Sequence, residues 1–244
     1  MRLATLILLI TFISSPVWAM GQKVIYSVDG ETFEGYFISP EKEAPLVLMV
    51  HDWDGLTDYE KKRAEMLAAE GYAVFAVDMF GKGVRPTAVA DKKRLTGELY
   101  EDRKRMRSLL EGALETAAAR GNIDNAVAMG YCFGGSVVLE LARSGTGLKG
   151  FVPFHGGLAT PAGQDYSATK GALLVLHGSA DQVVSLDQFA ALAKQLESQG
   201  VPHEMLTYSG APHAFTVFDS PRYREDADRK SWNRFLDYLE TTLN

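Results

Sequence analysis

Residues 130–135, Gly130-Tyr131-Cys132-Phe133-Gly134-Gly135, decide the fold of this chain. They have the G-x-S-x-G spacing of a nucleophile elbow, a sharp turn from a strand into a helix, with cysteine in the place of serine. The apolar run at 126–131 predicts the strand, and the run that continues through 143 predicts the helix. The turn requires glycines because side chains on either flank would clash. It would lift the Cys132 thiol above a sheet and leave the Phe133 backbone N–H free to donate to an oxyanion.

This position predicts a reactive thiol. Cys132 is the only cysteine, so an intramolecular disulfide and a Cys-rich zinc site are excluded. A helix N-terminus favours the thiolate, which predicts alkylation at pH 6 faster than that of an ordinary thiol, whose pKa is roughly 8.5. A resting neutral thiol, activated only when substrate binds, is one alternative. A small buried cysteine without any chemistry is the other.

Strands and helices are predicted to alternate on both sides of the elbow. Asp29-Gly30 between two strand-like runs predicts a hairpin, and the unbroken apolar run at 45–50 is typical of a parallel strand buried on both faces. The predicted strands are 24–28, 32–38, 45–50, 72–77, 126–131, 150–154, 172–177 and 203–208. Capping boxes begin helices at Thr57 and Ser185, residues 87–120 form one or two helices, and a last helix carries Trp232 to Leu243. The pattern predicts a single α/β domain over 20–244, with a mostly parallel sheet, helices on both faces and an N-terminal antiparallel hairpin.

Composition and the N-terminus restrict where the chain works. Its 244 residues carry a net charge of −6, which argues against a nucleic-acid partner. Residues 1–19 combine Arg2, a short apolar run and the small residues Val17 and Ala19. We interpret them as a signal peptide cleaved after Ala19, with an uncleaved membrane anchor as the alternative. The mature protein is expected to be secreted or periplasmic, free of the membrane and monomeric.

Two further strand ends complete a candidate catalytic triad. Asp181 follows the strand at 172–177, and His213 lies in a Gly/Pro loop after the strand at 203–208. The chain order of nucleophile, acid and base is that of an α/β-hydrolase sheet. His213 would take the thiol proton, Asp181 would fix its tautomer, and Cys132 would form a thioacyl enzyme. A turn-capping aspartate and a surface histidine are the alternatives. The loop after Val50 is expected to supply the second oxyanion donor, the Trp53 N–H.

The chain resembles the dienelactone hydrolase family. The marks are the elbow at 130–135, Gly178-Ser-Ala-Asp181 and His213-Ala-Phe215. The resemblance covers essentially the whole mature chain and implies a single-domain α/β hydrolase that opens small lactones or esters through a Cys-His-Asp triad without a cofactor. It also implies that Asp52, at the place of a longer glutamate, contacts the cysteine and helps to ionise it.

The binding residues depart from the family pattern. Family members that cleave dienelactone hold the substrate carboxylate with two arginines. Here Lys82 stands near the first position, with Arg85 close by, and Val217 stands at the second. One lysine cannot reproduce a bidentate guanidinium clamp, so an uncharged ester, thioester or lactone is expected. Phe80 and Phe215 are candidate apolar walls of the pocket, together with Trp53 and Phe154.

Two other functions remain open at this point. Cys132 could serve thiol-redox or acyl-transfer chemistry, although redox function usually requires a resolving cysteine. The chain could also be a non-enzymatic binding module on a hydrolase scaffold. His51, His155 and His177 also lie near strand ends, but no spacing suggests a metal site.

Overall fold

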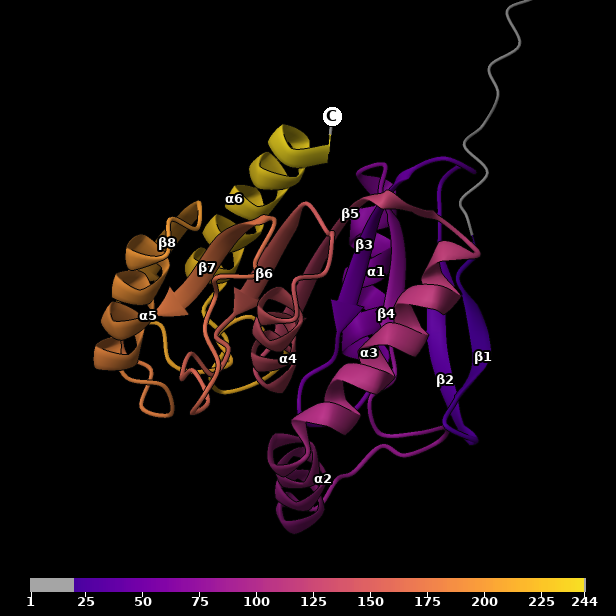
Figure 1. Cartoon of the computed structure of the whole chain (residues 1–244), viewed down its shortest axis with the longest axis horizontal. Coiled ribbons are helices and arrows are strands. Elements are labelled where there is room, and N and C mark those ends of the chain that lie inside the picture. The colour runs from indigo at the N-terminus through magenta and orange to yellow at the C-terminus, as the bar shows by residue number, and fades with distance from the viewer. Residues whose placement is uncertain (1–19, 244) are drawn as a thin grey trace, which may run out of the picture.

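The computed structural model describes residues 20–243, so the predicted signal peptide at 1–19 lies outside the described residues. One sheet of eight strands runs through the molecule in the order β1-β2-β4-β3-β5-β6-β7-β8 (Figure 1). The strands are β1 (Gln22–Val28), β2 (Glu31–Ile38), β3 (Pro45–Val50), β4 (Ala73–Val77), β5 (Asn122–Tyr131), β6 (Gly150–Phe154), β7 (Ala172–Gly178) and β8 (His203–Tyr208). β1 pairs antiparallel with β2, β2 pairs antiparallel with β4, and the other pairs are parallel.

Six helices accompany the sheet in the described part of the chain. They are α1 (Asp58–Ala69), α2 (Val89–Glu101), α3 (Arg103–Ala118), α4 (Phe133–Arg143), α5 (Leu186–Ser198) and α6 (Glu225–Leu243). Both predicted capping boxes are present, at Thr57 with Glu60 and at Ser185 with Gln188. The region left open as one or two helices is two helices, because Asp102 leaves helical geometry and its carboxylate accepts from the Arg105 N–H at 2.8 Å to begin α3.

The helices cover both faces of the sheet. Leu46, Leu48 and Val50 of β3 point to a core layer shared with α3, α4 and α5, whereas Val47 and Met49 point to a layer shared with α1 and α6. All of these β3 side chains are fully buried. This two-sided burial explains the unbroken apolar run in the sequence. The predicted single α/β domain, with its mostly parallel sheet and N-terminal hairpin, is confirmed.

The candidate functional residues meet at one edge of the sheet. Parallel strands end at a common edge, and ligand sites of such sheets lie in the loops that follow. α2 lies at this end of the molecule, whereas the chain reaches its C-terminal end at the opposite side (Figure 1). β1 begins on that opposite side as well, because it runs in the same direction as β4 and β3. Between residues 20 and 243, no helix combines the length and the apolarity needed to cross a bilayer.

Candidate active site

Cys132 occupies a strained turn between β5 and α4. Its φ of 51° and ψ of −110° lie in a region that side-chain-bearing residues rarely adopt. A hydrogen bond of 3.0 Å from the Cys132 N–H to the Phe154 carbonyl oxygen helps to hold the turn. A Cβ atom on Gly130 would overlap the Gly134 carbonyl, and one on Gly134 would overlap the Val50 carbonyl. The glycines of the elbow are therefore required by close backbone approach.

Three predicted residues meet in one hydrogen-bonded line. His213 Nε2 lies 3.0 Å from Cys132 Sγ, and His213 Nδ1 lies 2.8 Å from Asp181 Oδ2. Because an ionised carboxylate only accepts, Nδ1 carries the proton, and the Nε2 lone pair faces the thiol. The other carboxylate oxygen, Asp181 Oδ1, accepts from the N–H groups of Val183 and Val184 at 2.8 and 2.9 Å. These contacts orient the imidazole as a base toward sulfur.

The same contacts fix the charge of Asp181. Burial of its side chain alone would raise the pKa of the carboxyl. The hydrogen bonds from His213, Val184 and Val183 outweigh burial and hold the pKa below its usual value. Asp181 is therefore an anion at neutral pH, suited to stabilise an imidazolium on His213.

The resting thiol differs from the sequence-based expectation. Burial raises the pKa of the Cys132 thiol to about 12, and the nearby Asp52 carboxylate adds to the rise. A hydrogen bond from the Phe133 N–H, the contribution of the helix N-terminus, lowers the pKa by less. This direction of the pKa is opposite to the one that rapid alkylation at pH 6 requires, because loss of hydration outweighs the helix N-terminus. The structure supports the alternative of a neutral resting thiol.

Asp52 lies buried in the loop after β3, close enough to Cys132 to influence its pKa. Burial and the neighbouring Glu60 carboxylate raise the pKa of Asp52 to about 8. Its Oδ1 accepts from the Asp54 N–H at 2.7 Å, and its backbone N–H points to Glu60 Oε1 at 3.4 Å. At neutral pH the carboxyl next to the thiol is thus largely protonated.

The two candidate oxyanion donors differ in their present partners. The Phe133 N–H reaches toward the sulfur, as its effect on the pKa of Cys132 requires. The Trp53 N–H has no acceptor among residues 20–243. An unpaired N–H in this loop is available to a developing negative charge on a bound substrate.

Two of the predicted binding residues reach the surface of the protein, and two are fully buried. Phe80 is half-buried and packs on the ring of Phe133 at 5.5 Å, so it lies beside the elbow. Lys82 is exposed, and its backbone N–H donates to the Thr32 carbonyl at 2.9 Å. Phe215 is fully buried in the core layer of α1 and α6. The expectation that Phe215 forms a pocket wall is not met, because its ring has no surface left for a substrate; the same holds for Phe154.

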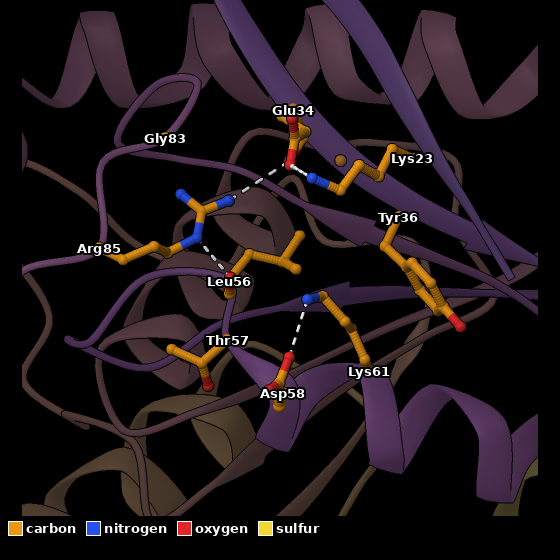
Figure 2. Close-up of a pocket in the computed structure, with 10 residues that line it drawn as sticks. Lys23, Glu34, Tyr36, Leu56, Thr57, Asp58, Lys61, Gly83 and Arg85 are labelled. Atoms are coloured by element: carbon orange, nitrogen blue, oxygen red, sulfur yellow. Dashed lines mark hydrogen bonds and ion pairs between the residues drawn. The ribbon is translucent and has the colours of Figure 1, made fainter.

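Arg85 braces two loops. Its guanidinium donates to the carbonyl oxygens of Leu56 and Val84 and lies 3.4 Å from the Asp78 carboxylate. Figure 2 shows it pointing toward Leu56 and Glu34 across a cavity of about 360 Å³. None of the three triad residues lines this cavity. The N–H donors of Arg85 hold the loop after β4 to the loop after β3. The expected role of Arg85 in substrate binding is therefore without support.

A buried network beneath His213 escaped the sequence analysis. The Arg63 guanidinium donates to the Thr216 carbonyl oxygen at 2.8 Å and to Asp228 at 2.5 Å. The Thr216 hydroxyl contacts Tyr59 Oη and His155 Nε2, each at 2.8 Å. The network therefore anchors the segment that follows His213. An arginine on the apolar face of α1, beside the buried Ala64, was the available signal.

Within residues 20–243, no group of three or more His, Cys, Asp or Glu side chains is arranged to hold a metal ion.

A thiol, an imidazole and a carboxylate in line at the carboxyl edge of a parallel sheet define an α/β hydrolase. Residues 33–243 match the model of the dienelactone hydrolase family, and the chain belongs to this family. Membership identifies it as an ester or lactone hydrolase.

Relatives align with this protein over nearly its full length. A provisionally named carboxymethylenebutenolidase of Aquifex aeolicus is 26% identical over 237 residues, covering 92% of this chain and 100% of that protein. The solved structure of a dienelactone hydrolase-like promiscuous phosphotriesterase, P91, from metagenomic libraries is 29% identical, with a TM-score of 0.86 and coverage of 93% and 99%. A structure titled m3DLH is 28% identical, with a TM-score of 0.87 and coverage of 93% and 100%.

Proposed function

We propose that this protein hydrolyses small uncharged esters or lactones through Cys132, His213 and Asp181 by way of a thioacyl intermediate. The observation that carries the proposal is the line from Sγ to Nε2 at 3.0 Å and from Nδ1 to Asp181 at 2.8 Å. A general base within hydrogen-bond reach of its nucleophile is the first geometric requirement of such chemistry.

In the first half of the reaction, Sγ attacks the carbonyl carbon while His213 Nε2 takes the thiol proton. The tetrahedral oxyanion accepts hydrogen bonds from the Phe133 and Trp53 N–H groups. When the C–O bond breaks, His213 returns its proton to the leaving alkoxide, and the acyl group stays on sulfur. Because burial raises the pKa of the resting thiol, His213 is needed to take the proton as sulfur attacks.

In the second half, water takes the place of the leaving alcohol. His213 removes a proton from the water as its oxygen attacks the thioester carbonyl. The collapse of this second tetrahedral intermediate breaks the C–S bond and returns the proton to sulfur. Asp181 stabilises the imidazolium in both halves.

The side chains around the site favour an uncharged substrate. Val217 stands four residues after His213 and cannot pair with a carboxylate. The guanidinium of Arg85 is engaged by backbone carbonyls and Asp78, and Lys82 is exposed. The half-buried ring of Phe80 beside Phe133 supports an apolar contact instead.

The test is hydrolysis of p-nitrophenyl acetate and butyrate by the wild type and by Cys132→Ala. We expect kcat/KM to fall by roughly a thousand-fold or more in the variant, as for loss of a triad nucleophile. Mass spectrometry during turnover is expected to find one acyl group on Cys132. Ser167→Ala, a change at an exposed position, is the control. Unchanged hydrolysis in Cys132→Ala would overturn the proposal.

A second comparison tests the charge of the substrate. A neutral lactone and the same lactone bearing a carboxylate are supplied at equal concentration. We expect the neutral compound to have the higher kcat/KM. The opposite order would show that a cation of the chain reaches the substrate.

We further infer from residues 1–19 that the protein is exported, and we propose separately that it works as a monomer. Fractionation of cells that express the full chain, followed by size-exclusion chromatography, tests both points. Recovery of the protein in the cytoplasmic fraction would contradict export. Elution at the mass of a dimer would contradict the monomeric state.

A further inference from the structure

One end of α2 contacts the loop that carries Trp53. The Lys92 ammonium group pairs with the Asp54 carboxylate and lies 5.2 Å from the centre of the Trp53 ring. The Lys92 side chain is 15% exposed, whereas the Asp54 side chain is 38% exposed, so the pair is open to water on the aspartate side. A cation over an indole ring at this distance is attractive. Lys92 thus holds both residues that follow Asp52.

The other end of α2 contacts the elbow. The Tyr100 ring meets the Phe133 ring edge-to-face, with centroids 5.5 Å apart. The Tyr100 hydroxyl donates to Ser136 Oγ at 3.2 Å, one turn further along α4. Tyr100 itself is held from below, because the Arg103 guanidinium lies 4.8 Å from its ring and donates to its carbonyl oxygen.

α2 has little other attachment to the protein. Of its residues, only Thr96 and Leu99 are buried, and Val89 is an exposed apolar side chain. Its N-cap, Ala88, makes no side-chain capping bond. The contacts of Lys92 and Tyr100 are therefore a large part of what holds α2 in place. Through the same contacts, α2 holds the Trp53 loop and the elbow.

We propose that α2 sets the spacing of the oxyanion hole, with Lys92 and Tyr100 as positioning residues for the N–H groups of Trp53 and Phe133. The inference rests on the proposed function. Lys92 and Tyr100 are separated by eight residues, which is roughly 12 Å along a helix, so one rigid element joins the two loops. Oxyanion donors act only when both lie within about 3 Å of the developing charge.

Two substitutions remove the contacts separately. Lys92→Met keeps the aliphatic stem and removes the charge, and Tyr100→Leu removes the ring. Each is expected to lower kcat for p-nitrophenyl acetate by about ten- to a hundred-fold, the usual effect of moving a catalytic group by about 1 Å. KM is expected to change less than about two-fold, because the donors act chiefly in the transition state.

The conservative variants separate positioning from general stability. Lys92→Arg keeps the ion pair and Tyr100→Phe keeps the ring contact, so both are expected to retain most of kcat. Lys93→Met, an exposed change on the same helix, is the matched control and is expected to behave as the wild type. If one helix joins the two donors, the fold-decrease of kcat in the Lys92→Met/Tyr100→Leu double variant is smaller than the product of the fold-decreases in the two single variants.

Alkylation of Cys132 by iodoacetamide is the readout that distinguishes the two proposals. Alkylation forms no oxyanion, so its rate in Lys92→Met is expected to stay within about two-fold of wild type. In Tyr100→Leu the alkylation rate also reports the hydrogen bond from the Phe133 N–H to the sulfur, so a fall there alongside the loss of kcat supports the displacement of that N–H. A KM increase at unchanged kcat, or full kcat in Lys92→Met with the fold verified by circular dichroism, would overturn the role of α2. Wild-type turnover that does not depend on Cys132 would instead overturn the proposed function.

Discussion

Cys132 combines a strained backbone with a protonated thiol. The positive φ is held by the hydrogen bond to Phe154 and by glycines that admit the neighbouring backbone. The high pKa follows from burial and from the carboxyls on either side, Asp52 and Asp181. The residue is thus oriented for attack but not ionised, and its reactivity depends on His213.

The ionisation state is tested by alkylation with iodoacetamide across pH. Cys132 is expected to react more slowly at pH 7 than free cysteine, with a rate that still rises at pH 9, because its pKa is about 12. Asp52→Asn removes a negative charge that forms only as pH rises through about 8. This variant is therefore expected to react faster than wild type above that pH and similarly below it.

The label is unambiguous because the chain has one cysteine, and Cys132→Ala is the blank. A rate plateau below pH 7 would mean that the resting residue is a thiolate. Equal rates for Asp52→Asn and wild type at pH 9 would mean that Asp52 does not act on the sulfur.

At the scale of elements, α1 and α6 are joined through the segment that carries His213. Arg63 of α1 bonds to Asp228 of α6 and to the carbonyl of Thr216, three residues beyond the imidazole. The Arg63 side chain is 1% exposed and lies 4.1 Å from the Phe218 ring. This buried pair fixes the loop after β8 against both helices.

Arg63→Met is expected to lower the free energy of unfolding by roughly 3–5 kcal/mol, because it leaves the Asp228 carboxylate buried without its partner. Urea unfolding measures the loss. The exposed pair of Arg229 and Asp226 supplies the control, since Arg229→Met is expected to change stability by less than about 1 kcal/mol. A loss in Arg63→Met as small as that of the control would contradict the anchoring role.

The sequence predicted those parts of the site that depend on local pattern. Cys132, Asp181 and His213 each follow a recognisable strand, and chain order suggested their roles. Arg85 and Phe215 were assigned to substrate from their place in the chain, but their contacts come from distant segments. The contact between Arg63 and Thr216 spans 153 residues, and that between Tyr100 and Ser136 spans 36. No local pattern contains such pairings.

The elements themselves were predicted well for a related reason. Turns, caps and apolar periodicity are local, so the strand at 150–154 and both capping boxes appear as expected. The sheet order could not be read in this way, because β3 lies between β4 and β5 through pairings distant in the chain. The sequence also left the protonation state of Cys132 between two alternatives, since burial depends on the whole fold.

At the scale of the molecule, the two core layers share every central strand. Val47 and Leu48 are adjacent in β3 but belong to opposite layers. If one core layer unfolds, the strands that also carry the other layer lose their packing on one face and become exposed to water. We therefore expect a single cooperative unfolding transition.

Urea unfolding followed by tryptophan fluorescence and by far-ultraviolet circular dichroism tests this expectation. Trp53 packs on one layer and Trp232 belongs to the other. The two signals are expected to have the same midpoint in residues 20–244, which lack Trp18, and in their Trp53→Phe variant, in which Trp232 alone reports on its layer. Separate midpoints would indicate that the layers unfold independently.

The two ends of the described chain lie away from the elbow. β1 begins, and α6 ends, at the edge where the parallel strands start, and the Leu243 carbonyl accepts from Asn125 at the beginning of β5. Cys132 lies at the opposite edge, where β5 stops. If the protein is attached to a bead, a particle or a bilayer through either of these ends, the candidate active site faces away from the support. Immobilised in this way, the enzyme would meet diffusing molecules as freely as it does in solution.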